Sequence, residues 1–241
     1  MRSIYIFSGL GTDDRVFQNI DLSGFQYSFI EWIPPFRNEE LASYCKRLSK
    51  QIKTCKPTLI GLSFGGIIAV EVAKFIETES IILIASVKTR EEIPFYYRLA
   101  GFFRLHTLVP TSFLLSPTVF VAWVFGVSTK KDKQLLTEIL NSTDPAFLKW
   151  AINEIVCWRN KARHYNLTHI HGMSDRILPR IFVKPDIVIP NGGHFMTVNK
   201  ALEVTNTIRS LLEDNSTMEA LMKFGELPDE MKYPDQEESS Q

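Results

Sequence analysis

The sequence has few cysteines and no motif that pairs them. Only three occur among 241 residues, Cys45, Cys55 and Cys157, and none belongs to a C-x-x-C pair. This count argues against a disulfide framework and favours a reducing compartment, so we expect a cytoplasmic protein. No charge of one sign dominates either, since Lys plus Arg and Asp plus Glu each number 27. Because binding to a phosphate backbone requires an excess of basic residues, we expect no nucleic-acid partner.

Long hydrophobic runs are also missing. The longest apolar stretch, 113–127, is interrupted by Ser116, Pro117 and Thr118 and is shorter than the ~20 residues of a membrane-spanning helix. The apolar run at 4–7 is too short for the core of a signal peptide. We therefore expect no membrane span and no export signal, and we expect the stretch 113–127 to be buried or to line a pocket.

The composition is that of a globular protein, with 45% hydrophobic and 22% charged residues. The charge is unevenly distributed along the chain. Residues 214–241 contain eight acidic residues against two lysines, a net charge of −6, which leaves +6 on residues 1–213. We expect a globular domain over residues 1–213 and an acidic C-terminal tail over residues 214–241.

Short apolar segments rich in β-branched residues alternate with segments of helical periodicity. Six strands are predicted, at 4–7, 27–32, 58–62, 81–85, 167–170 and 187–189. Several are apolar along their whole length, which is typical of parallel strands covered by helices on both faces. The alternation predicts an α/β fold with a mostly parallel, doubly wound sheet.

One interval breaks this alternation. About 80 residues separate the strand that ends near Ala85 from the one that begins near Leu167, and their pattern is helical throughout. Four helices are predicted there, near 90–105, 112–126, 130–141 and 145–158. Asp144 followed by Pro145 is a strong start signal for the last of them. We expect residues 87–160 to form a helical cap over the carboxyl edge of a sheet built by residues 1–86 and 161–213.

The segment Gly61-Leu62-Ser63-Phe64-Gly65 has the pattern G-x-S-x-G. It follows a predicted strand directly and opens an apolar helix, which is the context in which this pattern holds a nucleophilic serine. The glycines allow a sharp bend from which the Ser63 hydroxyl projects. We expect Ser63 to be the nucleophile of a catalytic site.

A serine hydroxyl needs a neighbouring base, and the base needs an acid that orients it. His194 lies in the loop after the last predicted strand and is the expected base. Asp175 lies in the turn after the preceding strand and is the expected acid. Asp186 is a second candidate, although it precedes its strand and would point to the opposite edge of the sheet. Ser63, Asp175 and His194 would all lie at the carboxyl ends of strands.

His169 and His171 are two residues apart and could share one strand face, which suggests a metal site. No third ligand is evident near them in the sequence. We therefore expect no metal and no other cofactor.

These motifs resemble those of the α/β-hydrolase superfamily, in its small bacterial members with a helical cap. The resemblance covers roughly residues 2–213 and rests on GLSFGG, HGMSDRILP, NGGH and the SGLG segment after the first strand. Relatives carry His-Gly-x-Gly at this last segment, where Ser8 replaces the histidine. The resemblance implies an oxyanion hole formed by the backbone N–H groups of Leu10 and Phe64. It also implies a sheet of about six strands, because the antiparallel strands that many relatives carry first are missing.

The resemblance implies a serine hydrolase, and most simply a carboxylic ester hydrolase that forms an acyl-enzyme. Aromatic residues are frequent in the predicted cap, which favours a small lipophilic substrate. The same fold and triad also support thioester hydrolysis, lyase reactions and cofactor-free haloperoxidase or perhydrolase chemistry. A non-enzymatic ligand-binding module is an alternative of another class, although the complete set of Ser63, Asp175 and His194 favours an enzyme.

Overall fold

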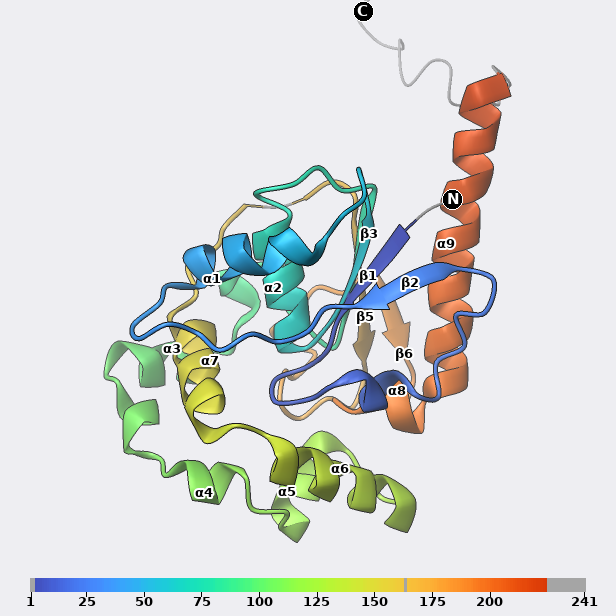
Figure 1. Cartoon of the computed structure of the whole chain (residues 1–241). Coiled ribbons are helices and arrows are strands. Elements are labelled where there is room, and N and C mark those ends of the chain that lie inside the picture. Colours follow the sequence, from blue (N-terminus) through green and yellow to red (C-terminus); the bar gives the residue numbers. More distant parts are fainter. Residues whose placement is uncertain (1–2, 163, 225–241) are drawn as a thin grey trace, which may run out of the picture.

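A computed structural model describes residues 3–162 and 164–224, and the side chains of residues 3–162 and 164–213. The strands of its sheet are β1 (Ser3–Phe7), β2 (Gln26–Phe29), β3 (Thr58–Leu62), β4 (Ser80–Ile84), β5 (Leu167–Gly172) and β6 (Ile187–Ile189). All neighbouring strands pair in parallel, in the order β2-β1-β3-β4-β5-β6 (Figure 1). The prediction of an α/β fold with a mostly parallel sheet of about six strands is confirmed.

The strand order reverses direction once. The chain runs from β1 outward to β2 at the edge and then returns to β3 on the other side of β1. Loops that leave β1 and β3 therefore diverge at the carboxyl edge of the sheet. In open α/β sheets, such a switch point is where ligands usually bind.

Helices α1 (Leu41–Leu48) and α2 (Phe64–Val72) cover one face of the sheet (Figure 1). Leu41, Tyr44, Cys45 and Leu48 recur at the spacing of one helical face, and all four are buried. A short 3₁₀ turn, η2 (Ser49–Gln51), continues α1. Helix α2 is buried at every position, which explains why its sequence is apolar all round.

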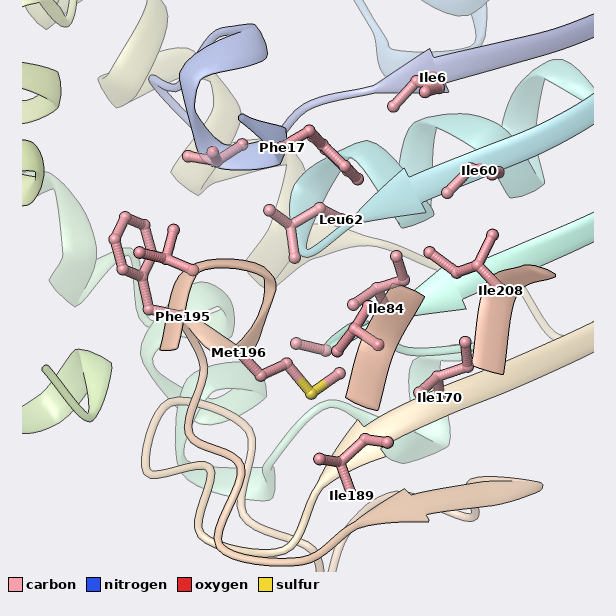
Figure 2. Close-up of a cluster of buried hydrophobic side chains, with 14 of the residues drawn as sticks. Ile6, Phe17, Ile60, Leu62, Ile84, Ile170, Ile189, Phe195, Met196 and Ile208 are labelled. Atoms are coloured by element: carbon pink, nitrogen blue, oxygen red, sulfur yellow. The ribbon is translucent and has the colours of Figure 1, made fainter. Parts of the chain in front are cut away.

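The opposite face is covered by η1 (Asp14–Phe17), α8 (Met196–Asn199) and α9 (Ala201–Phe224). Figure 2 shows Ile60, Ile84 and Ile170 on neighbouring strands pointing toward Met196 and the first half of α9. Residues that alternate with these isoleucines, such as Leu59 and Leu83, are buried on the α1 and α2 face. The central strands are therefore apolar along their whole length because both faces are covered.

Helix α9 runs past residue 213, where we expected the globular domain to end, and continues to Phe224. Residues 225–241 of the predicted acidic tail lie outside the described residues.

Between β4 and β5 lies a helical insertion, which we define as residues 87–160. Its elements are η3 (Arg90–Glu92), α3 (Phe95–Phe102), η4 (Leu105–Leu108), α4 (Thr111–Leu114), α5 (Val119–Phe125), α6 (Lys130–Ser142) and α7 (Pro145–Cys157). Helices α6 and α7 lie where the sequence predicts them. Each begins at a side-chain cap: Thr129 Oγ1 accepts a hydrogen bond from the Asp132 N–H, and Asp144 Oδ1, at the predicted start signal, accepts one from the Phe147 N–H.

The two other predicted helices, 90–105 and 112–126, are wrong as continuous elements, because each is broken into shorter pieces. Pro94 precedes α3, and Arg104 ends that stretch in the left-handed conformation with φ 55°. Pro117 separates α4 from α5, since proline lacks an N–H and holds the residue before it in an extended conformation. Among the described residues, no helix is both long and apolar enough to cross a membrane.

The insertion contacts loops that leave the carboxyl ends of the strands. Thr143 Oγ1 donates a hydrogen bond of 2.7 Å to the carbonyl oxygen of Gly11, in the loop after β1. The Phe195 N–H, after β6, donates one of 3.1 Å to the carbonyl oxygen of Phe125 in α5. These contacts place the insertion beside the edge of the sheet at which the expected site residues lie.

Candidate active site

Ser63 lies in a sharp turn between β3 and α2. Its backbone has φ 52° and ψ −118°, a combination that is unfavourable for a residue with a Cβ atom. The surrounding structure holds this conformation: the Ser63 N–H donates to the Ile84 carbonyl at 2.9 Å, and Ser86 Oγ donates to the Ser63 carbonyl at 2.6 Å. The neighbouring strand β4 therefore fixes both sides of the turn.

The glycines around Ser63 are required by close backbone contacts. A Cβ atom on Gly65 would collide with the carbonyl oxygens of Phe7 and Ser8, which follow β1. A Cβ atom on Gly61 would lie 2.5 Å from the Gly65 carbonyl oxygen. The turn can pass this close to β1 only because neither residue has a side chain.

Asp175 lies in the turn after β5, with its side chain buried. Its Oδ1 accepts hydrogen bonds from the N–H groups of Ile177 and Leu178, both at 2.9 Å. Burial by itself raises the pKa of Asp175, but the charge of His194 and the hydrogen bonds from His194 and Leu178 outweigh it and lower the pKa. Asp175 is therefore an oriented carboxylate at neutral pH.

His194 lies between Asp175 and Ser63. Its Nδ1 is 2.8 Å from Asp175 Oδ2, and its Nε2 is 2.8 Å from Ser63 Oγ. Because Asp175 is ionised and only accepts, Nδ1 carries the ring proton and donates it to the carboxylate. Nε2 is left as the acceptor for the Ser63 hydroxyl. His194 is buried and Ser63 is partly exposed, so Ser63 is the solvent-accessible member of this hydrogen-bonded series.

Asp186, the other candidate acid, takes part in a different set of contacts. It precedes β6, and its carboxylate pairs with Lys88 Nζ at 2.8 Å and accepts from the His169 N–H at 2.8 Å. The carboxylate hydrogen-bonded to His194 is that of Asp175.

His169 and His171 share one face of β5, with ring centroids 5.1 Å apart. His171 Nε2 lies 2.8 Å from the Leu178 carbonyl oxygen and 3.7 Å from Asp175 Oδ2. Burial lowers the pKa of both histidines, most strongly that of His169. Within residues 3–162 and 164–224, no three His, Cys, Asp or Glu side chains are grouped so that they could hold a metal ion. The pair packs behind the Asp175 turn, and His171 bonds to that turn directly.

The backbone groups expected to form an oxyanion hole lie on both sides of the switch point. Phe64 is the first residue of α2, so its N–H belongs to the first turn, in which N–H groups have no partner within the helix. Leu10 lies in the loop after β1, which approaches Gly65 closely. Trp32 Nε1 donates to Ser8 Oγ at 2.8 Å, and Ser8 Oγ donates to the Thr12 carbonyl at 2.7 Å. Ser8 stands where the resemblance leads one to expect a histidine. Its hydrogen bonds connect the loop after β1 to Trp32, in the segment that follows β2.

One aromatic side chain contacts the triad, and a cluster of others surrounds Phe64, the residue after Ser63. The Phe64 ring stacks on Trp32 at 5.8 Å, and Phe147 of α7 lies 5.5 Å from Trp32. The Phe125 ring of α5 meets the His194 ring edge-on at 5.8 Å. Phe125 belongs to the aromatic residues of the predicted cap, but the sequence did not show which of them face the site, and it did not single out Trp32. An aromatic residue in a loop or a short helix has no local signal that distinguishes pocket from core.

A shallow depression of about 650 Å³ lies elsewhere, at the opposite edge of the sheet. Lys56, Thr78 and Asn166, which precede β3, β4 and β5, contribute to its lining. It contains none of the expected site residues.

No protein-family model matches the sequence, and no curated protein matches it significantly. Solved structures do match. A thermophilic esterase from Thermogutta terrifontis is 17% identical over 89% of this chain and 90% of its own, with a TM-score of 0.66. MenH from S. aureus is 14% identical over 89% and 94%, with a TM-score of 0.69, and a bromoperoxidase from Bacillus anthracis is 13% identical over 88% and 92%, with a TM-score of 0.63. The chain has the α/β-hydrolase fold, as the resemblance predicts.

Proposed function

We propose that the protein is a serine hydrolase, and most simply a carboxylic ester hydrolase that acts on small lipophilic esters. The observation that carries this proposal is the continuous chain of two 2.8 Å hydrogen bonds from Ser63 Oγ through His194 to Asp175 Oδ2. Residues from three separate parts of the sequence meet at one edge of the sheet with the geometry of a nucleophile, a base and an orienting acid.

In the first half-reaction, Ser63 Oγ attacks the ester carbonyl carbon while His194 Nε2 takes the hydroxyl proton. Asp175 stabilises the imidazolium that forms and keeps the ring oriented. The tetrahedral intermediate then breaks its bond to the alkoxy oxygen, and His194 returns the proton to the leaving alcohol. The acyl group remains on Ser63 as an ester.

In the second half-reaction, water attacks the acyl-enzyme with His194 again acting as base. The carboxylic acid leaves and Ser63 is regenerated. The negative charge on the tetrahedral oxygen in both halves is assigned to the N–H groups of Leu10 and Phe64. The amino end of α2 adds a favourable dipole at the same place.

The aromatic surroundings support a lipophilic substrate. Phe64 and His194 each contact an aromatic side chain, Trp32 and Phe125 respectively. An aromatic ring beside the proposed base, as Phe125 is, favours an apolar acyl or alcohol group over a sugar or a charged peptide.

Other reactions remain alternatives on the same fold. Solved structures that match this chain include proteins named as an esterase, a bromoperoxidase and an N-acyl homoserine lactonase. A triad specifies an activated nucleophile and leaves the acyl donor and acceptor to the pocket. Thioester hydrolysis and perhydrolase or haloperoxidase chemistry are therefore separate arms of the test, and lyase chemistry stays an alternative that requires substrates of its own.

The test uses p-nitrophenyl esters of increasing acyl length, matched thioesters, and peroxide with acetate and bromide. We expect hydrolysis of the esters by the wild type and a loss in kcat on the order of 10⁴ or more in Ser63→Ala and in His194→Ala. Ser49→Ala, on the surface at the end of α1, is the matched control and should keep wild-type turnover. Turnover that survives in Ser63→Ala would contradict the proposal, and a folded wild type without any turnover would favour a ligand-binding module.

A further inference from the structure

Two helices of the insertion present their large apolar residues to solvent. In α3, Phe95, Leu99 and Phe102 lie on one helical face and are exposed, whereas Gly101 is buried against α7. A surface helix normally has the reverse arrangement, with its apolar face toward the core. The outward face of α3 therefore has the composition expected for a buried one.

Helix α5 and the connecting segments repeat the pattern. In α5 the exposed residues are Val119, Phe120 and Trp123, while the buried one is Ala122. The most exposed apolar side chains of the region are each 60–84% exposed: Phe102, Phe103, Leu108, Phe113, Val119 and Phe120. We call this set the apolar edge. Within the stretch 113–127 it corrects the expectation of burial for Phe113, Val119 and Phe120, whereas Ala122 and Val127 are buried as expected.

The apolar edge lies along one side of the molecule. In Figure 1, the green segment from α3 through α4 to α5 runs along the outside, with the yellow helix α7 between α3 and the sheet. Helix α7 contacts α3, η4 and α4 on their inner sides. The outer sides remain uncovered by the described part of the chain. Several large apolar side chains exposed along one segment in this way are typical of an interaction site.

The charged residues of the chain segment that carries the apolar edge are all basic. The sequence has no Asp or Glu between Glu92 and Asp132, but it has Arg98, Arg104, Lys130 and Lys131 in this interval. The last three are exposed. Arg176 adds a further cation, 4.4 Å from the Trp123 ring, and its Nη1 donates to the Trp123 carbonyl oxygen at 2.6 Å.

We propose that the apolar edge docks the protein onto the surface of an anionic lipid bilayer. Exposed Phe, Leu and Trp side chains would enter the boundary between head groups and acyl chains, and the basic residues beside them would contact lipid phosphates. Tryptophan and tyrosine prefer this boundary, and Tyr96 and Trp123 are exposed on the same helices, α3 and α5, as residues of the apolar edge. Helices α3, α4 and α5 have eight, four and seven residues, so they would lie in the boundary without spanning the membrane.

Charge favours lipid over a second copy of this chain. A symmetric contact through the apolar edge would bring two copies of Arg104, Lys130 and Lys131 together, and the segment contains no acidic residue to pair with them. An anionic lipid surface supplies negative charge all around the docked residues.

The docked edge would adjoin the triad. Helix α5 ends at Phe125, whose ring contacts the ring of His194. A lipophilic molecule that leaves the bilayer beside α5 would therefore enter next to Ser63. The docking itself does not depend on the proposed hydrolase, because no triad residue belongs to the apolar edge.

The test measures sedimentation of the protein with sucrose-loaded vesicles of phosphatidylcholine, alone or with 30 mol% phosphatidylglycerol. We expect binding to the mixed vesicles, weaker binding to phosphatidylcholine alone, and a decrease as salt is raised. The double variant Phe102→Ser/Phe120→Ser should weaken partitioning by about tenfold or more, because two large apolar groups no longer enter the lipid. Arg104→Glu/Lys131→Glu should weaken it by at least about fivefold per position, and only on the anionic vesicles.

Matched controls carry the same substitutions away from the apolar edge. Leu202→Ser, at an exposed site on α9, and Lys46→Glu, on α1, should bind as the wild type does. Ser63→Ala should also bind fully, which separates docking from the proposed chemistry. Thermal unfolding verifies that each variant is folded.

Absence of vesicle binding by the folded wild type would overturn the proposal. So would equal loss in the control variants. A concentration-dependent dimer in solution that Phe102→Ser/Phe120→Ser abolishes, without vesicle binding, would overturn it in favour of a self-association surface.

Discussion

The sheet and its flanking helices, residues 3–86 and 161–213, differ from the helical insertion in which kinds of side chain they bury and which they expose. We call the sheet and these helices the body of the molecule. In the body, Asp175 and His194 are polar, buried and hydrogen-bonded. In the insertion, Phe102 and Phe120 are apolar, large and exposed. Each arrangement is costly for folding and is found where a protein performs a function. In the two proposals above, the body would carry the reaction and the insertion would carry the docking surface.

The body also differs in how tightly its backbone is packed. The turn at Ser63 is hydrogen-bonded to β4, and the backbone at the end of β1 leaves no room for a Cβ at Gly65. Helix α3 of the insertion contacts α7 on one side and solvent on the other. Catalytic groups must be held within a fraction of an ångström, whereas a surface that binds fluid lipid needs no such precision.

The largest expected effect distinguishes the two candidate acids of the body, Asp175 and Asp186. Asp175→Asn should lower kcat/KM for an aryl ester by a factor on the order of 10³–10⁴, because an amide can donate to His194 Nδ1 and so favour the wrong tautomer. Asp186→Asn is the matched control, since its partners are Lys88 and the His169 N–H. Steady-state kinetics at pH 7.5 give the comparison. Equal losses in the two variants would show that Asp175 has no special role.

A smaller effect is expected from replacing one glycine in each region, Gly65 in the body and Gly101 in the insertion, which compares how tightly the two regions are packed. Gly65→Ala should destabilise the protein by about 3 kcal/mol or more, because its Cβ meets two carbonyl groups at the centre of the sheet. Gly101→Ala places a Cβ 2.7 Å from the Val156 carbonyl oxygen, but α3 can move toward solvent and alanine favours the helix. We expect that change to stay within about 1 kcal/mol. Urea unfolding measures the free energy of unfolding of both variants. Similar losses in the two would contradict the claim that the body is packed more tightly than the insertion.

The smallest effect concerns pH. His169 is buried in the body, and neither of its ring nitrogens has a hydrogen-bond partner among the described residues. Burial holds the pKa of His169 well below 6.5 in the folded state. The unfolded chain therefore binds a proton below about pH 6.5 that the folded chain does not, so stability is fully present above that pH and falls as the pH decreases.

His169→Leu should remove this contribution. For this one proton the wild type should lose about 0.7 kcal/mol per pH unit near pH 6.5 and approach about 1.4 kcal/mol per pH unit near pH 5.5, and the variant should lose correspondingly less. Urea midpoints at pH 7.5, 6.5 and 5.5 measure the slope. Measurements at pH 8, where the imidazole is neutral in both states, control for the change in packing. An unchanged slope would show that His169 takes up its proton in the folded state.

The sequence predicts the body well because its signals are local and repeated. The strands at 58–62 and 187–189 agree with β3 and β6 at both ends, since continuous apolar runs bounded by turn residues leave few alternatives. Predicted strand 27–32 ends earlier, at Phe29, because Trp32 turns away to bond Ser8 Oγ. The expected site residues also follow from local context, because Ser63, Asp175 and His194 each come directly after a strand or its turn.

The insertion is predicted less well for a physical reason. Apolar periodicity shows that a helix has an apolar face, but the pattern does not show whether that face meets the core or solvent. The stretch 113–127 looks like buried chain in the sequence, whereas Phe113, Phe120 and Trp123 are exposed in the structure. The link between Ser8, Trp32 and Phe64 depends on contacts across the sheet edge and likewise has no local signal.

The most direct test of the central claim is reaction with a fluorophosphonate probe, followed by mass spectrometry of the labelled peptides. We expect one label per chain, on Ser63, and labelling at least about 10³-fold slower in His194→Ala, because only the hydrogen-bonded imidazole activates this hydroxyl. A folded wild type that stays unlabelled, or one labelled at another serine, would contradict the account.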